Sequence, residues 1–182
     1  MENQPRWTSS IHSTNYTRYV RWQTPQPGVI KLNFDGSYAN SSAAGGFLLR
    51  DWMGKVIKAA AVNYGHTLSL VAEARAVEDG VLLALRAGYT EIAIEGDNLI
   101  VIQALNGEGH IPWQILNIIK DIQLLIQQDV QVSFTHIFRE AKMAADWLSK
   151  FGHSITHTCI TDFCFSPVLL KLLRLILLDA LL

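Results

Sequence analysis

The sequence predicts an α/β domain in which helices pack on a mixed five-stranded sheet, with its elements in the order βββαβααβα. Three features support this fold class. Short segments alternate apolar and polar residues as strands do, and longer segments repeat apolar residues at helical spacing. Three predicted strands come first, and the part of the chain that follows alternates between helices and strands. The chain has 182 residues, of which 49% are hydrophobic and 17% charged, so it is long and apolar enough to bury a core.

Three strands are expected first. Residues 29–35, VIKLNFD, alternate cleanly and run into Asp-Gly, which is a turn signal. Two further strands are expected over residues 45–51 and 55–64, with only Trp-Met-Gly between them. Such short connections predict an antiparallel meander of three strands.

Helices and strands alternate in the rest of the domain. A helix is predicted from Ser69 to Ala87, because apolar residues recur every three to four positions and Gly88 is placed to end it. Residues 91–97, EIAIEGD, form a second clear alternating strand that leads directly into a helix. The remaining predicted elements are helices over residues 98–105, 113–128 and 140–150 and a strand over residues 130–136.

The two ends of the chain differ in composition from the domain predicted over residues 29–152. Residues 1–28 are polar and contain three prolines, so they are expected to form a linker or an N-terminal tail. Residues 153–182 end in a Leu-rich run, which predicts an amphipathic helix that docks on the domain or on a protein partner. Three charged residues interrupt this run, so no membrane span is expected.

Charge and cysteine content bear on partners and compartment. The formal net charge is −1, so the protein as a whole does not attract nucleic acid, and any such binding has to be local. Two cysteines cannot form a disulfide scaffold, and the N-terminus lacks the apolar core of a signal peptide. We therefore expect an intracellular protein, in the nucleus or the cytoplasm, that is not secreted and acts as a monomer.

Four carboxylates occupy positions that suggest a shared metal site. Asp35 and Asp97 each end a predicted strand, whereas Glu73 and Asp146 border the apolar faces of predicted helices. Carboxylates at the border of a core are costly unless they are hydrogen-bonded or bound to cations. Mg²⁺ prefers such hard oxygen ligands, and two of these ions about 4 Å apart would suit phosphodiester cleavage.

Each of these carboxylates also has an ordinary explanation. Asp35 fits a turn, and Asp97 fits the N-cap of the following helix. Glu73 and Asp146 fit solvated positions on helices. The combination of the four, rather than any one of them, favours a metal site.

Four strings in a fixed order carry a family resemblance. They are KLNFDGSYANSSAAGGFLLRDWMGKVIKA, AEARAVEDGVLLAL, IEGDNLIVIQAL and HIFREAKMAADWLSK. Together they resemble the ribonuclease H (RNase H) family, and most of all the reverse-transcriptase-like RNase H domains that end plant non-LTR retrotransposon polyproteins. The resemblance covers about residues 20 to 151.

This resemblance implies the RNase H-like fold, with the same order of elements as above. It also implies a divalent-metal endonuclease that cuts the RNA strand of RNA–DNA hybrids by a two-metal-ion mechanism, with Mg²⁺ or Mn²⁺ as cofactor. The family's metal ligands fall on Asp35, Glu73, Asp97 and Asp146, and its mobile catalytic histidine falls on His136. The implied partner is the hybrid, distinguished from DNA by its 2′-hydroxyl groups.

His136 allows two interpretations. It continues the alternation of Val132 and Phe134, which would point it to the core as a structural histidine. At the end of the strand it could instead emerge beside the site and transfer a proton, because an imidazole titrates near neutral pH.

Several positions depart from the family pattern. Lys142 stands where relatives usually have Asn, and a cation four residues before Asp146 could pair with it and compete with metal. Ser41, Ser69 and Leu99 stand where bacterial members contact the hybrid through amide side chains. Two alternatives to an active nuclease therefore stay open. One is a catalytically weak or inactive nucleic-acid-binding remnant of a retroelement polyprotein, and the other is a scaffold whose tail recruits a protein.

A second metal site is suggested by spacing alone near the C-terminus. His153, His157, Cys159 and Cys164 have the order of a zinc site. The single residue between His157 and Cys159 is too short for the usual paired ligands, which favours a loop with buried thiols instead.

Overall fold

The computed structural model describes residues 23–126, 129–137, 143–156 and 159–161. Its strands are β1 (Ile30–Ala39), β2 (Ser42–Arg50), β3 (Val56–Gly65), β4 (Glu91–Gly96), β5 (Gln131–His136) and β6 (Cys159–Thr161). Its helices are α1 (Ser69–Arg86), α2 (Leu99–Leu105), α3 (Leu116–Leu125) and α4 (Met143–Gly152).

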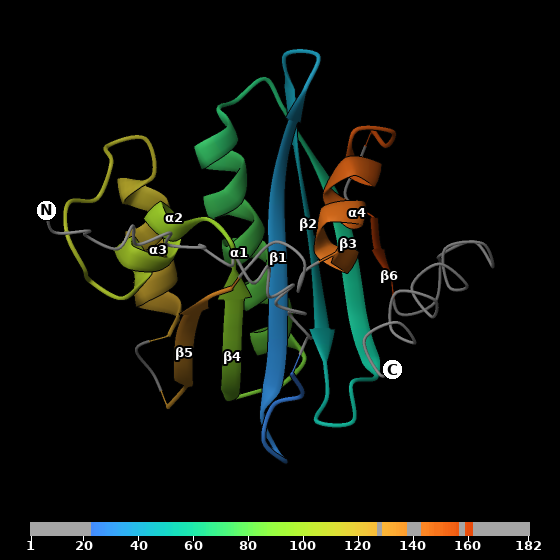
Figure 1. The fold of residues 1–182 in the computed structure, drawn as a ribbon, viewed down its shortest axis with the longest axis vertical. Helices are drawn as coiled ribbons and strands as arrows, with labels where there is room; N and C mark the ends of the chain where they lie inside the picture. Colours follow the sequence, from blue (N-terminus) through green and yellow to red (C-terminus); the bar gives the residue numbers. More distant parts are fainter. Residues whose placement is uncertain (1–22, 127–128, 138–142, 157–158, 162–182) are drawn as a thin grey trace, which may run out of the picture.

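These elements form one sheet with helices on both faces (Figure 1). The strand order is β5-β4-β1-β2-β3-β6, with β1, β2 and β3 antiparallel and β4 and β5 parallel to β1. The predicted five strands and the order βββαβααβα are confirmed. A sixth strand, β6, pairs with β3 at the edge, so the sheet continues beyond the predicted boundary at residue 152.

The first hairpin is longer than the sequence pattern predicts. β1 and β2 stay paired as far as Ala39 and Ser42, and the chain turns at Asn40 and Ser41. Both turn residues have positive φ, 50° and 60°, which is the geometry of the tight turns that join antiparallel strands. Asp35 therefore lies inside a strand instead of in the turn that Asp-Gly predicted.

The helices lie close to their predicted positions. α1 begins at Ser69, as expected, and ends one residue early at Arg86. α3 is shorter than predicted: it begins at Leu116 instead of Trp113, because a turn that includes Pro112 precedes it. α4 ends two residues beyond its predicted last residue, at Gly152.

Two apolar cores lie on opposite faces of the sheet. The larger packs α1, α2 and α3 against one face and includes Leu32, Phe34 and Phe47. The smaller packs α4 against the other face through Leu48 and Leu148. The alternation of β1 thus turns its apolar residues to α1, whereas Asp35 contacts Ser149 of α4.

Most of the predicted tails lies outside the described residues. Of the N-terminal segment the structure describes residues 23–28, and the backbone oxygen of Gln23 accepts a hydrogen bond of 2.5 Å from Lys31 Nζ. The predicted Leu-rich helix lies outside the described residues altogether. None of the helices in the described part of the chain has the length and apolarity needed to cross a membrane.

Candidate metal centre

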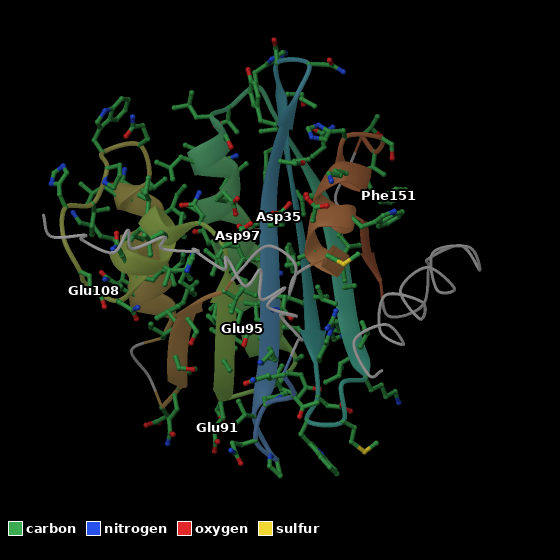
Figure 2. The ribbon with its side chains drawn as sticks, in the orientation of Figure 1. Asp35, Glu91, Glu95, Asp97, Glu108 and Phe151 are labelled. Carbon is green, nitrogen blue, oxygen red and sulfur yellow. The ribbon has the colours of Figure 1, made fainter. Side chains whose placement is uncertain are left out.

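The register of the two central parallel strands brings Asp35 and Asp97 to the same level. β1 and β4 pair as far as Asn33 and Glu95, and two residues later each chain reaches one of these aspartates. β4 ends at Gly96, whereas β1 continues, so Asp97 leaves the sheet beside Asp35 (Figure 2). The carboxyl end of a parallel strand thus holds two carboxylates side by side, as ligand sites in such sheets commonly do.

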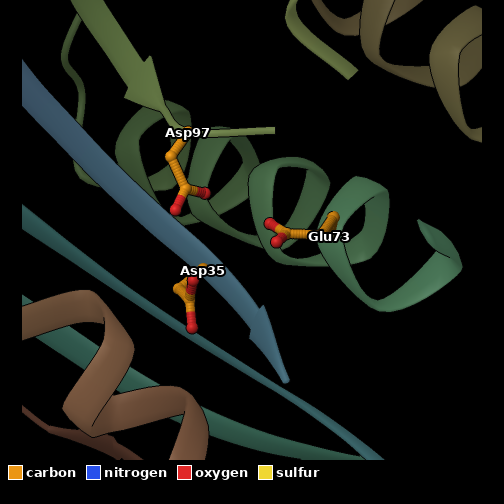
Figure 3. A group of neighbouring side chains, drawn as sticks. All are labelled: Asp35, Glu73 and Asp97. Carbon is orange, nitrogen blue, oxygen red and sulfur yellow. The ribbon is translucent and has the colours of Figure 1, made fainter. Parts of the chain in front are cut away.

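The third carboxylate comes from α1, which approaches β1 closely. A Cβ on Gly36 would lie 2.4 Å from the backbone nitrogen of Glu73, so only glycine fits at that position. This close approach places the side chain of Glu73, which is 7% exposed, beside the two aspartates. Figure 3 shows the three side chains as neighbours, coming from β1, α1 and the end of β4.

The three carboxylates are close enough to share a cation. One oxygen from each of Asp35, Glu73 and Asp97 lies within 4.8 Å of the other two. Asp35 and Glu73 are buried and Asp97 is half-buried. Three negative charges at this spacing repel one another strongly, and a divalent cation with oxygen ligands would offset that repulsion. The donor set consists of oxygen atoms alone, which fits Mg²⁺ or Mn²⁺.

The structure does not bring the fourth predicted ligand, Asp146, into this cluster of described carboxylates. Its Oδ2 instead accepts a hydrogen bond of 2.6 Å from Lys150 Nζ, one helical turn further along α4. The side chain of Asp146 is 19% exposed and that of Lys150 is 61% exposed. Lys142, which the sequence predicted as the cation on Asp146, lies outside the described residues.

His136 lies beside the cluster and is exposed. His136 is the last residue of β5, beyond Val132 and Phe134, which pack against the larger core, so the alternation that would have pointed it to the core does not extend to this position. Its Nε2 lies 3.0 Å from the backbone oxygen of Asp97. A carbonyl oxygen can only accept, so Nε2 carries the proton in this contact. His136 is thus attached to the residue that supplies a carboxylate of the cluster.

A second polar group, which the sequence did not single out, lies below the cluster on the same face. Lys31 Nζ is 2.5 Å from Glu95 Oε1, and Asn33 Nδ2 donates to Glu95 Oε2 at 3.0 Å. Arg50 is buried nearby, and burial lowers its pKa to about 10 although Glu95 acts in the opposite direction. The sequence contained a signal for this group, because Lys31 and Asn33 alternate with apolar residues on β1 just as Asp35 does. Of these polar residues, only Asp35 was singled out as a candidate ligand.

The positions expected to contact a hybrid are at the surface. Ser41 and Ser69 are exposed, and Leu99 is 49% exposed at the start of α2. Ser41 lies in the β1–β2 turn, where its backbone oxygen is 2.7 Å from Nδ1 of His66.

The suggested zinc ligands are only partly described. His153 Nε2 lies 2.9 Å from Ser37 Oγ on β1. His157 and Cys164 lie outside the described residues, and Cys159 belongs to β6, where the prediction placed a loop.

The fold is that of an RNase H-like domain. The model of the reverse transcriptase-like family matches residues 33–152, so the chain belongs to that family. A protein of Arabidopsis thaliana, named as a candidate ribonuclease H, is 25% identical over 141 residues, which is 76% of this chain. The chain spans 23% of the length of that relative.

Solved structures support the same fold. The chain is similar to RNase H1 of Halobacterium salinarum, with a TM-score of 0.65 and 22% identity over 69% of this chain and 98% of that one. It is also similar to LC11-RNase H1, solved in complex with an RNA/DNA hybrid, with a TM-score of 0.61 and 20% identity. That match covers 67% of this chain and 94% of the other. At such identities the likeness concerns the fold alone.

Proposed function

We propose that this domain is a metal-dependent endonuclease that hydrolyses the RNA strand of RNA–DNA hybrids. The observation that carries the proposal is the convergence of Asp35, Glu73 and Asp97 within 4.8 Å at the carboxyl end of β4. Three carboxylates at this spacing are destabilising to the folded chain unless something positive lies between them. A site with this cost is expected to have a function.

Divalent ions are the cofactor that this donor set fits. Asp35, Glu73 and Asp97 would hold Mg²⁺ or Mn²⁺, and Asp146 would complete a second position once its carboxylate leaves Lys150. Bound ions of this kind supply an activated water and neutralise charge on the leaving oxygen. The protein's own contribution is to fix the carboxylates from three different elements in one place.

His136 would transfer a proton at the same site. Its Nε2–H is directed to the backbone oxygen of Asp97, which fixes the ring beside the cluster. The ring is exposed, so solvent can reach it. We assign it the delivery of a proton to the leaving group or the release of product.

The hybrid is favoured as substrate by family membership and by the solved relative that holds an RNA/DNA hybrid. The formal net charge of −1 means that affinity would have to come from local contacts. The exposed surface around Ser41 and Ser69 can supply hydrogen bonds, whereas Leu99 cannot. Selection for RNA would rest on contacts to its 2′-hydroxyl groups.

A second candidate is a nucleic-acid-binding remnant with little or no activity. The observation that favours it is the ion pair between Asp146 and Lys150, which occupies a predicted metal ligand. In this alternative the domain keeps its fold and its affinity for nucleic acid, while it binds metal weakly.

A cleavage assay on a panel of substrates distinguishes the two candidate functions. The full chain is incubated with Mg²⁺ and an RNA strand labelled at one end, presented single-stranded, paired with DNA or paired with RNA. A nuclease of the proposed type cuts only the hybrid, leaves 5′-phosphate ends, and stops when a chelator is added. Hybrid binding without cleavage, at any concentration of Mg²⁺ or Mn²⁺, would favour the remnant. Cleavage of all three substrates would contradict the proposed specificity.

A further inference from the structure

A buried serine on α4 contacts Asp35, one of the three carboxylates of the cluster. Ser149 is 0% exposed, and its hydroxyl donates to Oδ2 of Asp35. Gly46, the register partner of Asp35 on β2, lets α4 come this close, because a Cβ there would lie 2.2 Å from the backbone nitrogen of Ser149. The helix backbone therefore delivers the hydroxyl directly to the carboxylate.

The same hydroxyl has a second acceptor in its own helix. Ser149 Oγ is 2.9 Å from the backbone oxygen of Asp146, three residues earlier. A hydroxyl has one proton, so it can donate to only one of these two oxygens at a time. The carboxylate is the stronger acceptor, because hydrogen bonds to a charged oxygen are about twice as strong as those between neutral groups. The bond to Asp35 is therefore the one expected to persist.

We propose that Ser149 is a positioning residue for the metal site. By donating to Oδ2, it sets the rotation of the Asp35 carboxylate in the cluster with Glu73 and Asp97. Groups that hydrogen-bond to metal ligands commonly orient them, and their removal typically weakens metal binding by about 10- to 100-fold. The inference rests on the proposed metal site, and it adds that α4 acts on this site through Ser149 as well as through Asp146.

A second contact, between β1 and the residue that directly follows α4, makes this role separable from simple packing. His153 Nε2 lies 2.9 Å from Ser37 Oγ. His153 directly follows Gly152, the last residue of α4, and Ser37 follows Asp35 by two residues, so this contact ties the end of the helix to the same strand. Only the Ser149 contact reaches a carboxylate of the cluster. Loss of His153 should loosen α4 without removing a hydrogen bond from Asp35.

The test is a calorimetric titration of the full chain with Mn²⁺ alone, at a temperature where circular dichroism shows every variant folded. Ser149→Ala is expected to weaken Mn²⁺ binding about tenfold. Ser149→Thr keeps the hydroxyl and should restore binding to within about threefold of wild type. His153→Ala should bind Mn²⁺ as the wild type does. If Ser149→Thr does not fold, Ser149→Ala and His153→Ala decide the question.

Equal Mn²⁺ affinity in Ser149→Ala and wild type would overturn the proposal, and so would an equal loss in His153→Ala. A wild-type chain that binds no Mn²⁺ would overturn both this inference and the proposed metal site. If Ser149→Ala alone loses affinity while no protein cleaves the hybrid, Ser149 keeps its role and the proposed nuclease activity fails.

Discussion

Gly36 on β1 lies directly against the backbone of Glu73 on α1. A Cβ on Gly36 would be 2.4 Å from the Glu73 nitrogen and 2.8 Å from its Cα. Both obstructing atoms belong to a helix backbone, which cannot move aside as the end of a flexible side chain can. The position of the Glu73 carboxylate beside Asp35 therefore depends on the absence of a side chain at residue 36.

Gly36→Ala should displace α1 from β1 and separate Glu73 from the other carboxylates. We expect the free energy of unfolding to fall by about 1–3 kcal/mol, which is typical of overpacking, and Mn²⁺ affinity to fall with it. Chemical denaturation and calorimetric titration measure the two effects.

Gly45→Ala is the matched control for that substitution. Gly45 pairs with Gly36 across the sheet, and the three atoms nearest to a Cβ there would belong to Tyr64, the closest a ring carbon at 2.5 Å. It should lower stability while Mn²⁺ affinity stays at the wild-type value. A loss of metal binding in Gly45→Ala equal to that in Gly36→Ala would refute the specific role of the Gly36 contact.

His136→Ala should slow turnover at saturating metal by about 10²- to 10⁴-fold, the usual contribution of general acid–base catalysis. Because His136 is exposed, the melting temperature of the variant should stay near the wild-type value, and its affinity for the hybrid should be retained. His110→Ala, another exposed histidine, serves as the control for both measurements. A wild-type turnover number in His136→Ala would remove this residue from the proposed mechanism.

Lys150→Ala should release the Asp146 carboxylate from its ion pair. Exposed pairs of this kind contribute about 0.2–1 kcal/mol, so Mg²⁺ should bind up to about fivefold more tightly and stability should change little. Lys120→Ala removes an exposed cation from α3 and controls for the change in net charge. Unchanged Mg²⁺ affinity in Lys150→Ala would mean that the ion pair does not compete with metal.

Asp79 makes the stability of the fold depend on pH. Burial raises its pKa, although the hydrogen bond from Tyr64 and two nearby arginines act in the opposite direction. The folded state therefore keeps this proton to higher pH than the unfolded state does. The resulting contribution to stability is present below the unfolded pKa of about 3.9 and is lost as pH rises through the folded pKa.

Asp79→Asn should remove that dependence. Relative to wild type, its free energy of unfolding should increase as pH rises above about 4, as measured by urea denaturation at several pH values. Tyr64→Phe removes the 2.9 Å hydrogen bond to Asp79 and should steepen the decline instead. Parallel curves for Asp79→Asn and wild type would contradict the raised pKa.

The pattern of apolar residues predicted most of the fold. The alternation in residues 29–35 and 91–97 identified the two central strands, and helical spacing identified α1 to within one residue of its end. The hairpin was predicted too short because Asp-Gly is a local turn signal, whereas pairing with β2 extends β1 to Ala39. β6 is three residues long, and its pairing with β3 is a long-range contact that no local pattern reports.

The site was predicted in part for a similar reason. Asp35, Glu73 and Asp97 were named from their places at strand ends and a helix border, and the structure brings them together. The rotamer of Asp146 depends on whether Lys150 or the cluster attracts it, and spacing along a helix does not decide between them. Ser149 looked like any small polar helix residue, because its contact with Asp35 joins positions far apart in the chain.

The most direct test of the metal-dependent nuclease is the cleavage rate of an RNA–DNA hybrid by wild type and by Asp35→Asn at saturating Mg²⁺. Asn has nearly the volume of Asp but no charge, so the fold should persist, with a melting temperature at or above that of wild type. The rate should fall to background, because the cluster loses one of its three carboxylates. Wild-type cleavage by a folded Asp35→Asn protein would contradict the assignment of this cluster as the catalytic site.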